Sequence, residues 1–344
     1  MIIASMFLGL FVLVLINVPI AVALAVATTV AMVVTQGTAI LPNVALVMMD
    51  GATKFPLIAI PLFILAGAIM NTGGLSRRLI AFASALFGFV RGGLAMINIG
   101  TSMFFAEISG SAVADVAALG SILIPAMKRK GYPAPFAAAV TSSSATLAVI
   151  IPPSIPMILY AVMAQTSVVQ LFVAGIVPGI IGGLGMMGMS YWFARRYNYP
   201  VEEVFHFSRL VETFKDAGLA FTLPFIILGG IFGGFVTATE GAALAVLASL
   251  IISIVYREMS LHHLKEAIIE GGMHTAVVML LVASSVLVGV YLTEAQVPQK
   301  LAEGIMEITS NRYFTLAILN VFFLVVGFFL HSAAAIILVV PIVM

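Results

Sequence analysis

Residues 92–127 read GGLAMINIGTSMFFAEISGSAVADVAALGSILIPAM. The run is apolar enough to lie in a membrane, but Ser109-Gly110-Ser111 interrupts it near its centre. Glycine and serine weaken a helix at that point. We therefore expect two helices that enter and leave the membrane on one side, a re-entrant hairpin, rather than one span. Irregular backbone at membrane depth persists only when it is buried in protein or lines a wet cavity.

Three other apolar stretches are broken in a similar way. Proline removes a backbone donor, and small polar residues weaken a helix. A single break of this kind is a common helix kink, whereas four in one chain favour a pathway for a solute. The breaks are Ile151–Pro156 within 134–165, GGFVTATEG within 218–256, and His331-Ser332 within 320–344.

The composition is that of a membrane protein. The chain has 344 residues, of which 62% are hydrophobic and only 8% charged, against about 25% charged residues in soluble domains. This excludes a water-soluble enzyme, a nucleic-acid-binding protein and a disordered protein. The absence of cysteine excludes disulfides and thiolate metal sites. The apolar run from Ile2 to Val34 has no basic start and is too long for a signal peptide, so we expect it to be the first membrane segment.

The two halves of the chain are predicted to be inverted copies of each other. Asn17–Val26 (NVPIAVALAV) matches Thr237–Val246 (TATEGAALAV). The basic loop at Arg77-Arg78 corresponds to a loop at Gln299-Lys300 that is poor in positive charge, so the positive-inside rule gives the halves opposite topologies. Inverted repeats with broken helices are typical of secondary transporters.

This repeat predicts an all-α polytopic membrane protein in three parts. Because Met344 corresponds to about Ile122 of the first half, we expect the second half to be C-terminally truncated. The parts are a first inverted repeat, 1–197, with the hairpin 92–127 and a broken helix 134–165; an amphipathic interfacial linker helix, 198–216; and an incomplete second repeat, 217–344, whose hairpin is cut at 344.

The two strongest breaks could together form an ion site. Hydroxyls at the hairpin tip and carbonyls freed by Pro152 and Pro153 are the oxygen ligands that a hard cation prefers. A substrate carboxylate would suit the half-helix N-termini after Ser111 and after Ser332. The alternative is a structural kink with serines bonded back to the preceding turn. The residues alone do not decide between sodium and proton coupling.

Three acidic residues lie inside apolar runs: Glu107, Asp115 and Glu240. Ionisable residues in such places are candidates for ion coupling or gating. Each also adjoins a break and could cap a helix N-terminus instead. An intramembrane hydrolase using Ser109 or Ser111 with His331 and Asp115 is a remote alternative. A channel is a third, although localised breaks favour an occluding transporter.

Three runs resemble the large membrane subunit of TRAP (tripartite ATP-independent periplasmic) transporters, the DctM-like family. The similarity extends over essentially the whole chain, and the SGSAVAD and PPS sequences are the most specific parts. The runs are Phe105–Met127 (FAEISGSAVADVAALGSILIPAM), Ser142–Met157 (SSSATLAVIIPPSIPM) and Gly233–Val246 (GGFVTATEGAALAV).

The resemblance implies a sodium-coupled secondary importer of small organic acids in the bacterial inner membrane, working by an elevator mechanism. It also implies two partners, a small four-helix DctQ-like membrane subunit and a DctP-like periplasmic substrate-binding protein. Candidate substrates are C4-dicarboxylates, sialic acid and similar carboxylates. A proton-coupled organic anion transporter without a binding protein is the alternative.

Carried over to this chain, the resemblance implies two groups of site residues. The first sodium (Na⁺) site would use hydroxyls at the hairpin tip and backbone carbonyls at the Pro-Pro break: Ser109, Ser111, Ala148, Ile151 and Pro153. The substrate site would use residues at the tips and at the break: Gly110, Ser111, Ser154 and Ser332. A second ion site would lie near Ser332, with its partner break beyond this sequence.

Overall fold

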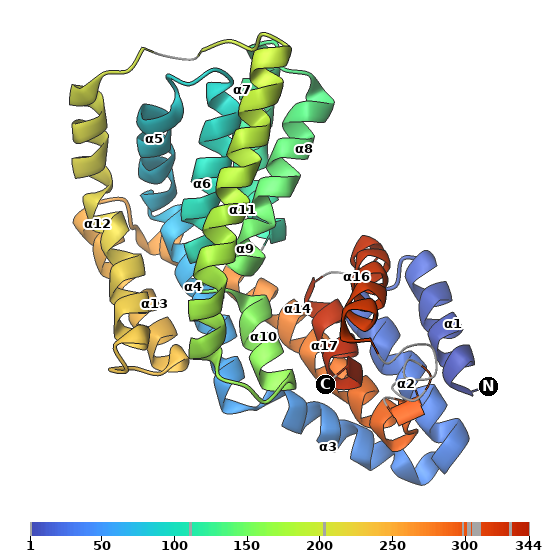
Figure 1. Cartoon of the computed structure of the whole chain (residues 1–344). Helices are drawn as coiled ribbons and strands as arrows, with labels where there is room; N and C mark the ends of the chain where they lie inside the picture. Colours follow the sequence, from blue (N-terminus) through green and yellow to red (C-terminus); the bar gives the residue numbers. More distant parts are fainter. Residues whose placement is uncertain are drawn as a thin grey trace. The chain divides into compact units, whose positions relative to one another are not determined.

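The computed structural model describes residues 2–109, 112–201, 204–297, 299–300, 304, 311–329 and 332–343, and in this part the chain forms helices and no strand (Figure 1). Short 3₁₀ turns, η1 (Thr38–Ile40) and η2 (Phe55–Ile58), flank α3. The helices are α1 (Ile2–Leu15), α2 (Ile20–Gln36), α3 (Leu41–Ala52), α4 (Ala59–Thr72), α5 (Leu75–Phe87), α6 (Gly93–Ser109), α7 (Ala112–Arg129), α8 (Ala134–Ala145), α9 (Leu147–Ile150), α10 (Ile155–Met163), α11 (Val168–Arg196), α12 (Phe207–Phe232), α13 (Ala238–Val255), α14 (Leu261–Glu294), α16 (Arg312–Phe329) and α17 (Ser332–Val343).

The chain divides into two compact units. The smaller unit comprises Met1–Leu57, Leu159–Thr166 and His274–Met344, and the larger comprises Ile58–Ile158 and Ser167–Met273. Each unit takes residues from both predicted repeats. The units reflect packing rather than duplication, so the inverted repeats and their boundaries stay a prediction.

Several helices are suited to a lipid environment. Five described helices are long and apolar enough to cross a membrane, and a sixth span results if α8–α9 and α10, which meet at 45°, are counted together. Large apolar side chains on these helices are exposed, for example Leu184 at 59%, Phe225 at 78% and Met273 at 67%. Such exposure is costly in water and suits hydrocarbon. The five helical segments are Phe55–Thr72, Val168–Arg196, Phe207–Phe232, Ala238–Val255 and Leu261–Glu294.

The first apolar run differs from the expected single segment. It forms two helices, α1 and α2, that pack against each other. Asn17 adopts a left-handed conformation with φ 67°, and Pro19 stands immediately before α2. Asparagine tolerates this conformation, and proline cannot continue the preceding helix, so the chain turns between residues 15 and 20.

The expected interfacial linker helix also differs from the structure. Residues 204–206 are not helical, and the charged segment that follows is continuous with the apolar segment in α12. The charged segment 261–272 is likewise continuous with the apolar part of α14. Between the polar and apolar parts of each helix, the residues that weaken a helix are glycines. A glycine costs only about 1 kcal/mol in a helix interior, which is too little to end either helix.

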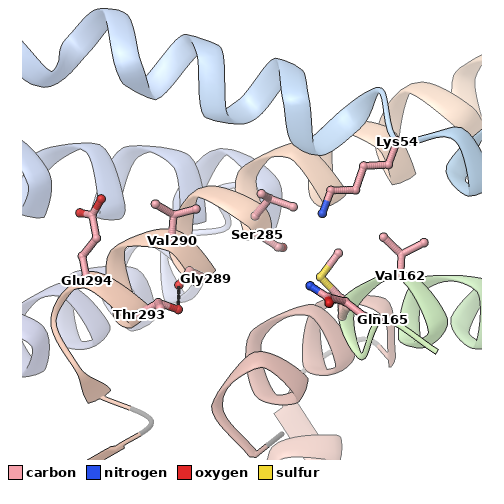
Figure 2. Close-up of a pocket in the computed structure, with 10 residues that line it drawn as sticks. Lys54, Val162, Gln165, Ser285, Gly289, Val290, Thr293 and Glu294 are labelled. Atoms are coloured by element: carbon pink, nitrogen blue, oxygen red, sulfur yellow. Dashed lines mark hydrogen bonds between the residues drawn. The ribbon is translucent and has the colours of Figure 1, made fainter.

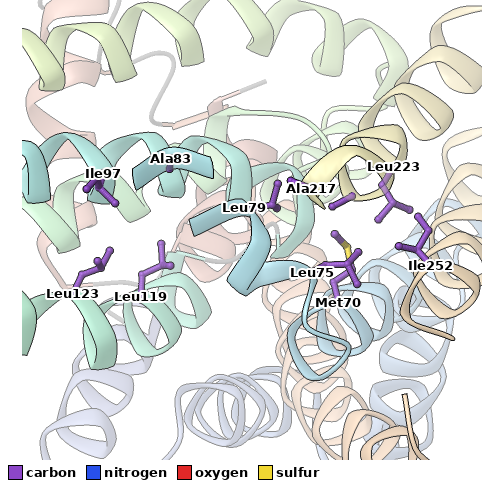
Figure 3. Close-up of a cluster of buried hydrophobic side chains, with 11 residues drawn as sticks. Met70, Leu75, Leu79, Ala83, Ile97, Leu119, Leu123, Ala217, Leu223 and Ile252 are labelled. Atoms are coloured by element: carbon purple, nitrogen blue, oxygen red, sulfur yellow. The ribbon is translucent and has the colours of Figure 1, made fainter. Parts of the chain in front are cut away.

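The larger unit is built around one apolar core between α4, α5, α6, α7, α12 and α13. Small residues let the helices approach closely: Ala83 and Ala217 are fully buried beside Leu75 and Leu223. Figure 3 shows these side chains converging from separate helices. The core residues are Met70, Leu75, Leu79, Ala83, Ile97, Leu119, Leu123, Ala217, Ala220, Leu223 and Ile252.

An ionic cluster joins three segments at one end of this core. The Arg78 guanidinium lies 2.7 Å from Glu258 and 3.2 Å from Asp216, and it covers the ring of Tyr256 at 3.9 Å. Arg77 also pairs with Glu258. The cluster links α5 and α12 to the connection between α13 and α14, so we expect it to hold these ends together.

Burial raises the pKa of the Glu258 carboxyl, but the hydrogen bonds and charges of Arg78 and Arg77 outweigh it, so the pKa lies below its ordinary value of 4.5. A carboxyl whose pKa is lowered by folding stabilises the protein at higher pH. That stabilisation is fully present above 4.5 and is lost as the pH falls through the lower value in the folded state.

We predict that Glu258→Gln lowers the free energy of unfolding at neutral pH by about 1 kcal/mol, because Arg77 loses its counter-ion and Arg78 keeps only Asp216. The variant should also lose less stability than the parent when the pH is lowered below 4.5. Thermal unfolding in detergent at several pH values measures both effects. Glu266→Gln, on the exposed face of α14, is the control and should unfold as the parent does. Parallel pH profiles for the parent and Glu258→Gln would contradict the prediction.

Candidate functional site

The candidate site lies in the larger unit, where the segment 92–127 folds back on itself. The Asn98 side-chain nitrogen near the start of α6 lies 3.9 Å from the Met127 sulfur near the end of α7, so the two helices pack side by side in antiparallel directions. The α6 helix ends at Ser109 and α7 begins at Ala112. Gly110 and Ser111 lie outside the described residues, as do the side chains of Ser109 and Glu107. The re-entrant membrane placement stays a prediction.

The second part of the site is the broken helix α8–α9–α10. The α9 helix ends at Ile150, the next residue is extended, and Pro152–Pro153 is a cis peptide bond. Neither proline has an N–H, so the carbonyls of Ala148 and Val149 have no donor four residues further along. Ser154, which is fully buried, donates its hydroxyl to the Val149 carbonyl at 2.7 Å. The helical pattern therefore leaves the Ala148 carbonyl without its usual partner.

The hairpin and the break are brought together by α9. This short helix packs against α6, α7 and α11. Ala148 and Ser154 are fully buried, and Ile151 is nearly so. The structure therefore places the predicted ion-site residues of the break, Ala148 and Ile151, beside both arms of the hairpin.

Glycines on α11 allow that helix to pack directly on the break. A Cβ atom at Gly175 would overlap the carbonyl oxygen of Ile150 and the side chain of Met157. At Gly179 it would come within 2.5 Å of the Cγ1 atom of Ile151. The backbone of α11 therefore covers one side of the irregular segment, as buried irregular backbone in a membrane requires.

A buried polar contact connects the hairpin to the broken helix. The Asn98 amide donates to the Thr141 hydroxyl at 2.6 Å, and Thr141 donates to the Ala137 carbonyl. One turn along, the Ser102 hydroxyl donates to Ser144 at 2.9 Å. Sequence reasoning did not identify Asn98 and Ser102 as contacts between the hairpin and the broken helix. Their four-residue spacing within an apolar run is the signal that could have found them.

The acidic candidates have different environments. Glu240 caps the N-terminus of α13: its carboxylate accepts the Thr237 N–H at 2.7 Å, and the Thr237 hydroxyl accepts the Glu240 N–H. Of the two roles considered for Glu240, helix capping and ion coupling, this geometry is that of a helix cap. Asp115 is in the first turn of α7 and is only 1% exposed. Its buried position beside the hairpin turn suits either capping or coupling.

The second predicted tip lies in the smaller unit. The α16 helix is described as far as Phe329, and Ser332 is the first residue of α17. His331 lies outside the described residues. Ser332 is thus placed at a half-helix N-terminus, and its role in substrate or ion binding stays a prediction.

These features define an integral membrane protein with a helical hairpin packed on a broken helix. A sequence model of the tripartite ATP-independent periplasmic transporter, DctM component, matches residues 7–344. The chain belongs to this family.

The names of similar proteins give different transported substrates. The chain is 39% identical over 340 residues to the isethionate TRAP transporter permease protein DctMQ of Oleidesulfovibrio alaskensis, covering 97% of the chain and 53% of that protein. It is 39% identical to the C4-dicarboxylate TRAP transporter large permease protein DctM of Pseudomonas aeruginosa, covering 87% and 70%. It is 35% identical to the sialic acid TRAP transporter large permease protein SiaM of Vibrio cholerae, covering 86% and 69%. The chain therefore spans about half the length of the first relative.

We predict that Gly175→Ala lowers the free energy of unfolding by about 1–3 kcal/mol, because a methyl group cannot fit against the Ile150 carbonyl without displacing the break. Thermal unfolding in detergent measures the change. Gly185→Ala on the same helix is the matched control, since no described atom lies within 4 Å of its added Cβ. Equal stability of the two variants would contradict the close packing of α11 on the break.

A second prediction concerns the contact between α6 and α8. Asn98→Ala should cost about 1–3 kcal/mol, because it removes a buried hydrogen bond to Thr141. Combining it with Thr141→Val should cost less than the sum of the two single variants. Thr222→Val, an exposed threonine bonded within its own helix, is the control. Additive losses in the double variant would exclude a direct contact.

Proposed function

We propose that the chain is the large membrane subunit of a sodium-coupled secondary transporter that imports a small organic acid across the bacterial inner membrane. Family membership and the names of the relatives support the transporter class over an enzyme. The observation that carries the proposal is the break at Ala148–Ser154, packed against both arms of the hairpin. A buried site with freed carbonyls suits a hard cation that has lost its water.

In this proposal, Na⁺ is held by the carbonyls of Ala148, Ile151 and Pro153 together with hydroxyls at the hairpin tip. The break supplies oxygens without a formal charge, which favours a monovalent ion over a divalent one because fewer charges need to be balanced. Ser154 holds the irregular segment in shape through its bond to Val149. Substrate would bind beside the ion, near Ser154 and the N-termini of the half-helices.

The proposed partners are a small DctQ-like membrane subunit and a DctP-like periplasmic binding protein. The name DctMQ of one relative indicates that the large and small subunits are joined in a single chain there, and that relative is nearly twice as long as this one. The binding protein would select the substrate, since the relatives carry different organic anions with similar membrane subunits. An elevator motion of the hairpin-bearing part would move the ion and the substrate together.

The proposal is tested with the whole protein and its small subunit in liposomes. Uptake of a labelled organic acid delivered by the binding protein is compared under an inward sodium gradient and under potassium with a proton gradient. We expect uptake only with sodium and only with the binding protein. Uptake driven by protons alone would overturn sodium coupling and direct attention to buried Asp115 and to Glu107.

The ion site itself is tested by substitution. We predict that Ser111→Ala weakens sodium binding by about tenfold, because it removes a direct oxygen ligand. Thr141→Ala should have a smaller effect, since Thr141 contacts Asn98 rather than the ion. Sodium titration monitored by thermal stability compares them. Equal sodium affinities in the two variants would contradict the assignment of the hairpin tip.

A further inference from the structure

The smaller unit contains a pocket that is separate from the hairpin and the Pro-Pro break. It is open to the surface and has a volume of about 370 Å³, within the usual range for small-molecule sites. Figure 2 shows the side chains around it, with Lys54 and Glu294 at opposite ends of the view. Its lining includes a cation, an anion, an amide and two hydroxyls among apolar side chains: Lys54, Val162, Met163, Gln165, Ser285, Val286, Gly289, Val290, Thr293 and Glu294.

One face of α14 forms the floor of the pocket. Ser285, Gly289 and Thr293 follow each other at four-residue spacing, so they lie in one row along the helix. Ser285 donates its hydroxyl to the Leu281 carbonyl at 2.7 Å, and Thr293 donates to the Gly289 carbonyl at 2.8 Å. Because their protons are already used, both hydroxyl oxygens can act only as acceptors. Ser285 is fully buried in the floor, so Thr293, which is exposed, is the one that can accept a hydrogen bond from a molecule in the pocket.

A close helix contact positions Lys54 above this floor. A Cβ atom at Gly51 would come within 2.7 Å of the Cβ atom of Val286, so α3 packs directly on α14 here. Lys54 follows just after the end of α3, and Figure 2 shows its amine directed toward Ser285. In the described part of the chain, Lys54 forms no ion pair, so its charge is available to a ligand.

Gln165, the second residue after α10, lies at the edge of the pocket in a conformation that is unusual for glutamine. Gln165 adopts a left-handed conformation with φ 51°, and the following N–H, of Thr166, bonds back to the Ala161 carbonyl at 2.9 Å. Glycine is the residue that adopts this conformation at least cost. A glutamine instead places an amide, which can both donate and accept, at the edge of the pocket.

The opposite end of the pocket carries negative charge. One oxygen of Glu294 accepts a hydrogen bond from Gln36 at 2.9 Å, which fixes the carboxylate beside Thr293. The walls between the two ends are formed by Val162, Met163 and Val290. A ligand that matches this pattern has an anionic group at one end, a short methylene chain, and a donor group at the other end.

We propose that this pocket binds a short organic acid whose carboxylate pairs with Lys54 and whose far end carries a hydroxyl or ammonium group directed at Thr293 and Glu294. The inference goes beyond the proposed function, because binding here requires neither transport nor a partner subunit. It also involves residues separate from those proposed for the sodium site.

The test measures binding to the whole protein in nanodiscs. Ser285 and Thr293 are about 12 Å apart along α14 at 1.5 Å rise per residue. Unsubstituted acids of about five to eight carbons are therefore compared with the corresponding ω-hydroxy and ω-amino acids, using equilibrium dialysis of labelled compounds. We expect the ω-substituted acids to bind about tenfold more tightly than the unsubstituted acids, because only they can donate to Thr293 and Glu294. Lys54→Gln should weaken binding by about tenfold or more.

Two further variants separate binding from folding. Gln165→Gly keeps the left-handed helix end and should unfold no earlier than the parent, yet bind the ω-substituted acids less tightly. Lys265→Gln, an exposed lysine in the larger unit, should bind as the parent does. The proposal is overturned if no compound binds the parent at millimolar concentration, or if Lys54→Gln binds as tightly as Lys265→Gln.

Discussion

The structure of the larger unit depends on satisfying backbone groups that Pro152 and Pro153 leave without partners. In hydrocarbon each such group costs several kcal/mol, so irregular backbone must be enclosed by protein. The elements around the break enclose its backbone in this way. Ser154 bonds to the freed Val149 carbonyl, the glycines of α11 bring that helix against Ile150 and Ile151, and α6 and α7 pack on α9. A hairpin and a broken helix are therefore one packed arrangement rather than two independent irregularities.

The two candidate sites of the chain differ in the chemistry they offer. The break presents backbone carbonyls and hydroxyls without a formal charge, which suits a small cation that has lost its water. The pocket in the smaller unit offers Lys54 at one end and Glu294 at the other, which suits a molecule with polar groups at both ends. The Arg78–Glu258 cluster instead holds helix ends of the larger unit together. Because only 8% of the residues are charged, a charged residue that is buried or lines a pocket is a candidate functional residue.

The sequence located the Pro-Pro break and the break at GGFVTATEG, because glycine and proline act through local backbone geometry. The helix ends at Ile150 and Phe232 follow from these residues. What the sequence did not reveal are contacts between distant segments. Nothing in the local pattern pairs Asn98 with Thr141, or brings Lys54 to the face of α14. The continuity of charged and apolar parts in α12 and α14 was also missed, because amphipathic character indicates which face is polar but not where a helix ends.

In the proposed mechanism, the hairpin turn and the Pro-Pro break together hold the coupling ion. Hydrogen–deuterium exchange of the whole protein in nanodiscs, in sodium and in potassium at equal ionic strength, tests it most directly. We expect sodium to slow exchange in two separate segments, around residues 107–115 and 146–155, and to leave α1 and α2 unchanged. Equal exchange of both segments in sodium and potassium, or protection of only one of them, would contradict a site shared by the hairpin and the break.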